Sequence, residues 1–553
     1  MGIDYFAAHR VTLDKALAAI ASREYWSPYP ESPRAHGEDA PARGQAAFEA
    51  RIGRPFVIDQ PATGTMDVAE TSPYGVELGV TYPRTDVGAL IEAATAAMAR
   101  WAKATPQVRA GVCLEILDRL NHTAFEMGHA VMHTTGQAFL MAFQAGAPHA
   151  LDRGLEAVAY AYAEQTRLPR SLRWEKPQGK RDPLVVDKAW RLRPAGVALV
   201  VGVSTFPTWN GYPGIFASLA TGNPVIVKPH PATILPLAIF VETARAVLAE
   251  AGFDPNVVML AVDTPQAPIA KELATHPSVK IVDYTGGAAF GTWLEQHATQ
   301  AVVFTEKSGI NSVVIDSVDD LKGMLRNLSV SMTMYSGQMC TTPQNVYIPS
   351  TGIETGEGHL DFDTVAAALA QAISGLLSDD ARAADLLGAL KGDAVLARID
   401  EAAAAGEVLL ASRVVANPTF PGATVRTPVV VRVDAADEEL YLREMFGPIV
   451  FVVATASTQE SLRLAAESAR HHGAITLLVY STDPAVMEAA EDAAVAGGVS
   501  VAFNLAGGLF VNQSAAFSDF HVTGANPAGN ASLTDPAFVA GRFRVVGVRR
   551  HVS

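Results

Sequence analysis

Cysteine is scarce in this chain, because only Cys113 and Cys340 occur among 553 residues. Two thiols cannot build a disulfide framework or a cysteine-rich zinc site, so each must be judged as a lone thiol. Basic residues are also in the minority, 42 against 57 acidic ones, and the formal net charge is -15. Because phosphate binding needs clustered cations, nucleic acid and anionic membrane surfaces are excluded as main partners.

Long apolar runs are missing as well, since no segment approaches the roughly eighteen uninterrupted apolar residues of a membrane span. Residues 1–26 lack the basic stretch, apolar run and small-residue cleavage site of a secretory signal, and are typical of a short amphipathic helix. We therefore expect a cytoplasmic protein without a membrane partner. A content of 49% hydrophobic and 18% charged residues is typical of a soluble globular protein. The length predicts roughly two to four domains.

From about residue 190 onward, short apolar, β-branched runs alternate with longer amphipathic stretches. This alternation predicts an α/β protein in which βαβ units surround parallel sheets. One series runs from GVALVVGVS at 196–204 to AVVFT at 301–305, and a second from SVVIDS at 312–317 to VSVAFNL at 499–505. Two consecutive α/β domains are the simplest interpretation.

The segments outside these two series predict other structures. Residues 85–165 are rich in alanine with apolar residues at helical spacing, which predicts a helical layer before the first sheet. Residues 20–80 contain many Pro, Gly and charged residues without strong periodicity, which indicates an irregular wrapping arm. The charged segment 172–192 is interpreted as a projecting hairpin. The tail FRVVGVRRHVS at 543–553 alternates as an edge strand would, and an exposed edge invites pairing with another subunit.

The two cysteines differ in their surroundings. Cys113 lies in VRAGVCLEILDRL at 108–120, an amphipathic helix, where a free cysteine acts as a small buried hydrophobe. Cys340 lies in YSGQMCTTPQNVY at 335–347, in a loop between a predicted helix and a predicted strand. Catalytic groups tend to lie in such loops, yet a half-buried, inert loop thiol explains this stretch alone equally well.

Two further stretches change this interpretation of Cys340. In VVFTEKSGINSVVI at 302–315, Glu306 ends one apolar run and lies 34 residues before Cys340. In LREMFGPIVFVV at 442–453, Glu444 precedes an aromatic residue, a glycine and a proline. Each carboxylate alone could be an ordinary strand-end or helix-capping residue. Together with ATGNPVIVKP at 220–229 and YTGG at 284–287, in this order and spacing, they resemble the aldehyde dehydrogenase superfamily over roughly residues 80–520.

This resemblance implies an aldehyde dehydrogenase-like fold: a Rossmann-type parallel-sheet cofactor domain, a second α/β catalytic domain, and a small oligomerisation hairpin with a strand. The boundaries we expect are an N-terminal arm at 1–70, a dinucleotide-binding domain at 71–306 interrupted by the hairpin at 172–192, a catalytic domain at 307–525, and a C-terminal oligomerisation segment at 526–553. Members of such a fold are expected to form a homodimer or a homotetramer.

The resemblance also implies a reaction. The Cys340 thiolate would attack an aldehyde, giving a thiohemiacetal and then a thioester, and Glu306 would activate water with a pKa raised by partial burial. Retention of this glutamate favours a free carboxylic acid over acyl transfer to coenzyme A. Most members have an oxyanion-binding asparagine before the FP of VGVSTFPTWNGYPG at 201–214, whereas this chain has Thr205. Either Thr205 replaces that donor, or Asn210 from the same loop does, or the enzyme is slow.

Cofactor-binding residues follow from the same resemblance. Lys228 would bind ribose hydroxyls, and Gly286 and Gly287 would let backbone N–H groups approach the pyrophosphate. Glu444 would hold the nicotinamide ribose, with Phe446 packed beside the ring.

NAD-selective members carry a glutamate three residues after this lysine, where this chain has Pro231. The loss of that repelling charge, together with a contact from His230, favours NADP, with NAD as the alternative. No metal is predicted, because the pair His129 and His133 lacks the glutamate of a zinc-binding HExxH motif and is interpreted as ordinary helix histidines.

Composition and spacing are silent on the substrate. STFPTWNGYP, SGQMCTTPQNVYIP and FHVTGANPAGNASLTDPAFVAGRFR are closer to the stand-alone aldehyde dehydrogenases called phenylacetic acid degradation protein PaaN. That resemblance implies oxidation of a CoA-linked semialdehyde in phenylacetate degradation, a branch of aromatic catabolism. The semialdehyde dehydrogenase of aerobic benzoyl-CoA breakdown and a general aldehyde dehydrogenase are alternatives. A catalytically silent scaffold that binds a dinucleotide or CoA is the alternative of another class.

Overall fold

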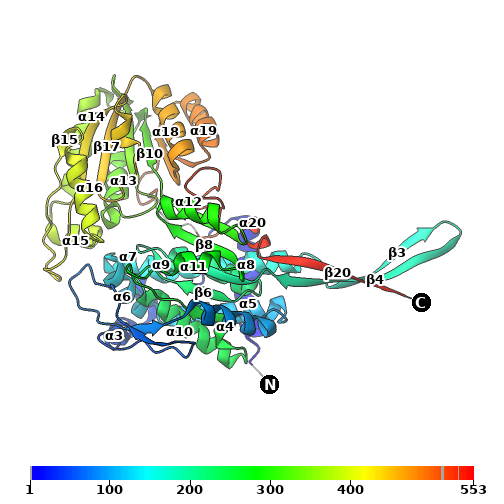
Figure 1. Ribbon diagram of the computed structural model, residues 1–553. Helices are drawn as coiled ribbons and strands as arrows, with labels where there is room; N and C mark the ends of the chain where they lie inside the picture. Colours follow the sequence, from blue (N-terminus) through cyan, green and yellow to red (C-terminus); the bar gives the residue numbers. More distant parts are fainter. Residues whose placement is uncertain (1–2, 512–515, 534, 553) are drawn as a thin grey trace.

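The computed structural model describes residues 3–511, 516–533 and 535–552, and Figure 1 shows two α/β units with an arm that projects from one of them. The α/β fold class predicted from the sequence is confirmed. Among the described residues, no helix is long and apolar enough to cross a membrane.

Helices dominate the first third of the chain. Three of them precede the predicted helical layer: α1 (Tyr5–Ala8), α2 (Arg10–Ser22) and α3 (Ala40–Glu49). The layer itself consists of α4 (Val87–Trp101), α5 (Pro106–His122), α6 (Ala124–Thr135), α7 (Phe139–Gly146) and α8 (Pro148–Thr166). Helix α3 lies in the stretch expected to be irregular, and its Gly44 lies directly against Phe125 of α6. The sequence of α3 has no strong apolar period, so local pattern did not predict this helix. Its contact with α6 stabilises it instead.

The first sheet has five strands in the order β7-β6-β5-β8-β9, and every neighbouring pair is parallel. Its strands are β5 (Val197–Val201), β6 (Val225–Lys228), β7 (Val258–Leu260), β8 (Val279–Gly286) and β9 (Val302–Lys307). The connecting helices are α9 (Pro207–Ala220), α10 (Leu235–Glu250), α11 (Ala270–Thr275) and α12 (Ala288–His297). The strand order reverses between β5 and β8, and ligands of open α/β sheets bind at such a reversal, beyond the carboxyl ends of the strands.

The second sheet has seven strands in the order β15-β16-β17-β12-β10-β18-β19, and only β15 runs antiparallel to its neighbour. Its strands are β10 (Asn311–Ile315), β12 (Pro343–Pro349), β15 (Glu407–Leu410), β16 (Val429–Asp434), β17 (Ile449–Thr455), β18 (Thr476–Tyr480) and β19 (Ser500–Phe503). The main helices are α13 (Leu321–Thr333), α14 (Phe362–Leu376), α15 (Asp380–Leu387), α16 (Asp393–Ala403), α18 (Thr458–His472) and α19 (Pro484–Gly497).

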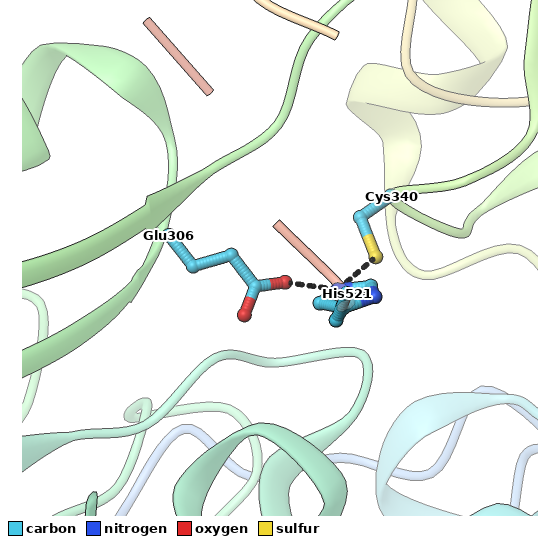
Figure 2. A group of neighbouring side chains, drawn as sticks. All are labelled: Glu306, Cys340 and His521. Atoms are coloured by element: carbon cyan, nitrogen blue, oxygen red, sulfur yellow. Dashed lines mark hydrogen bonds and ion pairs between the residues drawn. The ribbon is translucent and has the colours of Figure 1, made fainter. Parts of the chain in front are cut away.

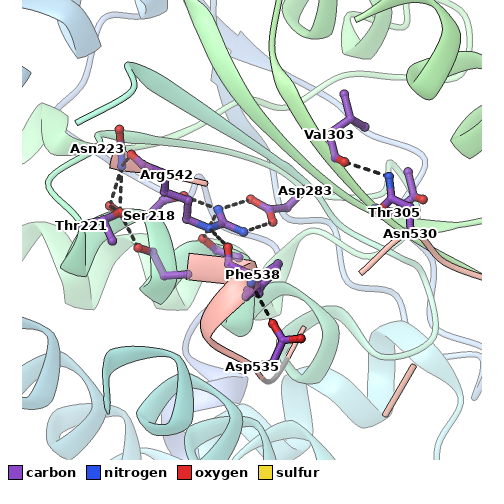
Figure 3. Close-up of polar contacts among 12 residues, drawn as sticks. Ser218, Thr221, Asn223, Asp283, Val303, Thr305, Asn530, Asp535, Phe538 and Arg542 are labelled. Carbon is purple, nitrogen blue, oxygen red and sulfur yellow. Dashed lines mark hydrogen bonds and ion pairs between the residues drawn. The ribbon is translucent and has the colours of Figure 1, made fainter. Parts of the chain in front are cut away.

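The arm is a three-stranded antiparallel sheet of β3 (Ser171–Gln178), β4 (Arg181–Pro194) and β20 (Phe543–His551), in the order β20-β4-β3. It projects away from both α/β units, and the chain ends along it (Figure 1). The base of the arm is held by Arg542, whose guanidinium binds Asp283 of β8 at 2.8 and 2.5 Å and Ser218 of α9 at 2.7 Å (Figure 3).

The segment before the arm lies along the edge of β9. The side chain of Asn530 accepts a hydrogen bond from the Thr305 N–H at 2.8 Å and donates one to the Val303 carbonyl at 2.9 Å (Figure 3). The Lys307 N–H donates to the Ala528 carbonyl at 2.6 Å. The C-terminal part of the chain is therefore fixed beside Glu306, which lies between Thr305 and Lys307.

Candidate active site

A strained turn presents Cys340. After α13, Tyr335 and Ser336 both have φ of 50°, and Gly337 has φ of 63°. Left-handed backbone costs an ordinary residue about 1–2 kcal/mol, and such strain concentrates at functional sites. A Cβ atom on Gly337 would lie 2.3 Å from the carbonyl oxygen of Gly447, so only glycine fits there. The turn thereby brings the EMFGP stretch at 444–448 against the cysteine loop.

Asn311, the first residue of β10, fixes the loop on its other side. Its amide nitrogen donates to the Cys340 carbonyl at 2.7 Å and to the Thr342 carbonyl at 3.1 Å. Its amide oxygen accepts from the N–H groups of Ile475 and Thr476, at 2.9 and 3.0 Å. One buried side chain therefore joins the loop to the sheet through four hydrogen bonds, one of which holds the Cys340 carbonyl.

Glu306 lies near the end of β9 and is only 1% exposed. The Asn210 amide donates to both carboxylate oxygens, at 3.0 and 2.9 Å, and His521 Nε2 lies 2.8 Å from Oε1 (Figure 2). Burial acts to raise the pKa of Glu306, but His521, Arg153 and Asn210 together hold it below its ordinary value. The raised pKa expected from the sequence is wrong, because that reasoning counted burial without the cationic and hydrogen-bonding partners.

His521 also belongs to this site, although no sequence motif pointed to it. Its Nε2 lies 3.7 Å from Cys340 Sγ, and its ring meets Trp209 edge-on at 4.5 Å. Figure 2 shows His521 between the cysteine and the carboxylate. The chain has 14 histidines, and nothing in the spacing of His521 marks it, because the contact joins segments 215 residues apart.

Arg153 is a buried cation close to Cys340, His521 and Glu306. Arg153 of α8 is 8% exposed, and its guanidinium carbon lies 4.4 Å from the centre of the Trp209 ring. Its charge favours the ionised form of both Glu306 and Cys340. For Cys340 this effect is outweighed, since burial first and the charge of Glu306 second raise the pKa of the thiol well above its ordinary value. The thiol is therefore protonated at neutral pH until a base takes its proton.

Cys340 and His521 both line a cavity of about 560 Å³. Most of its walls are apolar, with side chains from Met141, Phe206, Trp209, Met339, Leu505 and Phe520. We call this cavity the channel, and no lysine or arginine lines it among the described residues.

Thr205 is not among the described lining residues, although its neighbour Phe206 is. The Thr205 carbonyl accepts a hydrogen bond from Gln137 at 2.7 Å. Asn210, the alternative donor, is bound to Glu306 instead. The hydrogen bonds described for these two residues go to Gln137 and Glu306, and an oxyanion role for Thr205 stays a prediction.

The residues predicted to bind a dinucleotide lie at the carboxyl ends of the first sheet. Lys228 ends β6, and its Nζ lies 2.6 Å from Asp263 Oδ1, just beyond β7. Burial lowers the pKa of Lys228, against the opposing charge of Asp263. Gly286 ends β8 and Gly287 lies between β8 and α12, and a Cβ on Gly287 would meet open space. Open space at the N-terminus of α12 fits a pyrophosphate, and the Lys–Asp pair fits a ribose at the same edge of the sheet, where β5 separates β6 from β8.

Glu444 joins the two α/β units. A hydrogen bond links its carboxylate to Ser308, two residues beyond Glu306, and burial raises the pKa of Glu444 against that bond and the charge of Arg398. The Phe446 carbonyl accepts from Arg398 Nε at 2.9 Å. The hydrogen bond to Ser308 thus brings Glu444 close to the part of the chain that carries Glu306, which itself lies beside Cys340. His230 is exposed at the cofactor side.

Comparisons with known proteins agree with this arrangement. The family model described as the aldehyde dehydrogenase family matches residues 67–510, which is more than half of the chain. This chain belongs to the aldehyde dehydrogenase family. A crystal structure of an NAD-dependent aldehyde dehydrogenase from Burkholderia multivorans is 57% identical, with a TM-score of 0.98 and full coverage of both chains.

Curated relatives are more distant. Aldehyde dehydrogenase LUC3 of Fusarium sp is 24% identical over 419 residues, which cover 75% of this chain and 81% of the relative. A 2-aminomuconic 6-semialdehyde dehydrogenase of Pseudomonas sp is 28% identical over 289 residues, covering 49% of this chain and 55% of the relative. The match to this semialdehyde dehydrogenase, like the matches to several other curated relatives, spans about half of this chain and about half of the relative. The match to the superfamily that the sequence resembled is confirmed, and the chain is an NAD(P)-dependent aldehyde dehydrogenase.

Within this aldehyde dehydrogenase, the sulfur of Cys340, a nitrogen of His521 and an oxygen of Glu306 all lie within 4.8 Å of one another. Thiolate, imidazole and carboxylate are the ligands that zinc prefers. A metal ion held there would occupy the nucleophile. His129 and His133, by contrast, stack on Phe48 at 5.8 and 5.0 Å between ring centres, and they pack the helical layer.

Proposed function

We propose that this dehydrogenase oxidises its aldehyde to a free carboxylic acid through a thioester on Cys340, which Glu306 hydrolyses. The observation that carries the proposal is the meeting of sulfur, imidazole and carboxylate within 4.8 Å beside an apolar channel. The carboxylate is ionised and held by two partners, as a general base for water should be.

The chain's own residues supply most of the chemistry. The Cys340 thiolate attacks the carbonyl carbon, and the oxyanion that forms lies beside the Cys340 N–H, with Thr205 as the proposed second donor. A nicotinamide cofactor held by Lys228, Gly286, Gly287 and Glu444 would supply the hydride acceptor that turns the thiohemiacetal into the thioester. Glu306 then removes a proton from water as its oxygen attacks the thioester carbon. The tetrahedral group collapses, the carbon–sulfur bond breaks, and the sulfur leaves with its electron pair.

We propose NAD as the preferred cofactor and NADP as the alternative. The absence of an acid at Pro231 favoured NADP, but Asp263 brings a carboxylate to Lys228 from the neighbouring strand. A second lysine near His230, Lys391, donates to the Thr134 carbonyl, to the Ala232 carbonyl at 2.8 Å and to Thr233 Oγ1 at 3.0 Å. Both lysines are thus engaged and neither is free for a 2′-phosphate. The Burkholderia multivorans relative is named NAD-dependent, which supports the same choice.

For the substrate, we propose a CoA-linked semialdehyde of phenylacetate degradation, as the PaaN-like motifs imply. The channel would take the apolar acyl chain. Since no described lining residue is cationic, the CoA phosphates would remain outside it. The same lining favours a second candidate, a free apolar aldehyde. The benzoyl-CoA semialdehyde is a third candidate of the same chemical class as the first.

Initial rates with a panel of aldehydes test this function. We expect reduction of NAD with aldehydes alone, without added free CoA, and a loss of turnover in Cys340→Ala. A larger kcat/KM for a CoA-linked semialdehyde than for a free aldehyde of equal chain length supports the first substrate, and the reverse order supports the second. Cofactor binding without turnover of any aldehyde would favour the silent scaffold. A requirement for free CoA would contradict hydrolysis by Glu306.

We further propose a homodimer or homotetramer that assembles through the arm. The arm exposes apolar side chains, among them Leu172, Leu184, Val545 and Val546, and its outer strands β3 and β20 have free edges. The domain roles expected from the sequence and a cytoplasmic location stay predictions. Light scattering of the full chain and of a variant with Val545→Asp and Val546→Asp tests the assembly, since a smaller particle is expected for the variant.

A further inference from the structure

We propose that His521 is a third catalytic residue, which carries a proton between Cys340 and Glu306. The inference rests on the proposed function, because it assigns a step to the same sulfur and carboxylate. One ring nitrogen faces both groups: Nε2 lies 2.8 Å from Glu306 Oε1 and 3.7 Å from Cys340 Sγ (Figure 2). Asn210 donates to both oxygens of Glu306, so the carboxylate is held in place, and the single Nε2 atom of the imidazole is the group that contacts both end groups.

The ring is well placed for this task. Trp209 meets it edge-on at 4.5 Å, and the pairing of residues 528–530 with β9 fixes the segment that carries it. His521 also lines the channel, so a proton has a route to solvent. Histidine is the side chain that exchanges protons most readily near neutral pH. Charged groups near this site include Glu306, Arg153 below Trp209, and Glu156 beyond Arg153.

A carrier is needed because the two end groups are poorly matched. Burial and the charge of Glu306 keep the Cys340 thiol protonated, while its partners keep Glu306 ionised. The sulfur must still become a thiolate before it attacks. The Cys340 thiol also contacts Glu306 directly, but that carboxylate already accepts from Asn210 and His521, and the imidazole between the two end groups offers a second route for the proton.

The proposed step balances as follows. The proton on Nε2 passes to Glu306 Oε1, and the S–H proton of Cys340 passes to Nε2, so that the sulfur keeps its electron pair. Glu306 becomes a neutral acid, His521 is unchanged, and Cys340 is a thiolate. Nε2 of His521, which lines the channel, then releases its proton to solvent and takes up the proton of Glu306, so that the carboxylate is ionised again. After thioester hydrolysis the water proton is on Glu306, and the reverse movement returns it to the departing sulfur.

Alkylation of Cys340 by iodoacetamide tests the step without any aldehyde. The rate is measured against pH for the wild-type chain, for His521→Gln, and for His471→Gln as a matched control on the exposed end of α18. Peptide mass spectrometry separates Cys340 from the buried Cys113. We expect alkylation of His521→Gln to be about 10²-fold slower at neutral pH, with its midpoint shifted to higher pH. The control should follow the wild-type profile.

Chemical rescue separates proton transfer from a structural role. In His521→Ala, added imidazole should reach the site through the channel and restore a large part of the alkylation rate, whereas it should not change Cys340→Ala. A wild-type profile in His521→Gln would overturn the proposal, and so would slow alkylation that imidazole does not restore. Turnover of aldehydes by the wild-type enzyme is measured separately. An absence of turnover would contradict the proposed function, while the alkylation profiles would still decide the role of His521.

Discussion

Asn311→Asp is the substitution that best tests how the nucleophile is positioned. Aspartate has the same shape, so it can still accept from the N–H groups of Ile475 and Thr476. It cannot donate, and a carboxylate oxygen would face the carbonyls of Cys340 and Thr342, which now lie at 2.7 and 3.1 Å. Two hydrogen bonds at about 1 kcal/mol each are lost, and two carbonyls keep their desolvation cost of about 1–3 kcal/mol apiece.

The loop therefore needs about 3–5 kcal/mol to return to its present position, because part of the loss is recovered when the loop shifts. At about 1.4 kcal/mol for each factor of ten, kcat/KM should fall by roughly 10² to several times 10³, while the affinity for NAD stays unchanged. The assay is steady-state reduction of NAD, with fluorescence titration for cofactor binding. Asn417→Asp is the control, because Asn417 uses only its oxygen, which accepts from Thr419 and Phe420. Near-normal kcat/KM in Asn311→Asp would refute this account of the loop.

Three further substitutions test other parts of the structure. Gly337→Ala should abolish turnover, because its Cβ would lie 2.3 Å from the Gly447 oxygen at a φ of 63°, and a rate within tenfold of wild type would contradict the packing of this turn. Asp263→Asn should raise the kcat/KM for NADP relative to NAD by about tenfold or more, since it removes a charge that repels a 2′-phosphate; an unchanged ratio would place the selecting group elsewhere. Burial lowers the pKa of His133 from 6.5 to about 4, so the unfolded chain takes up this proton first, and about 3 kcal/mol of stability that is present above pH 6.5 is lost progressively as the pH falls from 6.5 to 4. His133→Gln should accordingly flatten the fall of Tm between pH 6.5 and 4, and an equally steep fall in the variant would show that another group is responsible.

Strong periodicity and turn chemistry made much of the fold predictable. The strands at Val197–Val201 and Val225–Lys228 follow the apolar β-branched runs, and glycines mark the helix ends beyond them. Between residues 378 and 448 the sequence predicted no element, yet the structure has α15, α16, β15 and β16 there. These elements are short or stabilised mainly by packing on their neighbours, so local pattern alone does not reveal them.

The residues of the site also differ in whether local sequence reveals them. Cys340 and Glu306 could be named because each lies in a short motif, and motifs are local. His521 and Asp263 could not, since each acts through contact with a residue from a distant segment. The direction of the Glu306 pKa failed for the same reason: burial can be guessed from a strand end, whereas His521, Arg153 and Asn210 meet the carboxylate only in the folded chain.

Trapping of an acyl-enzyme in Glu306→Gln is the most direct test of the central claim that Cys340 forms a thioester which Glu306 hydrolyses. The variant is mixed with excess NAD and a substrate aldehyde, and intact-mass and peptide mass spectrometry follow the product. We predict one burst of NADH, no steady turnover, and a chain heavier by one acyl group, located on Cys340. Full steady turnover, or an acyl group on any other residue, would contradict the account.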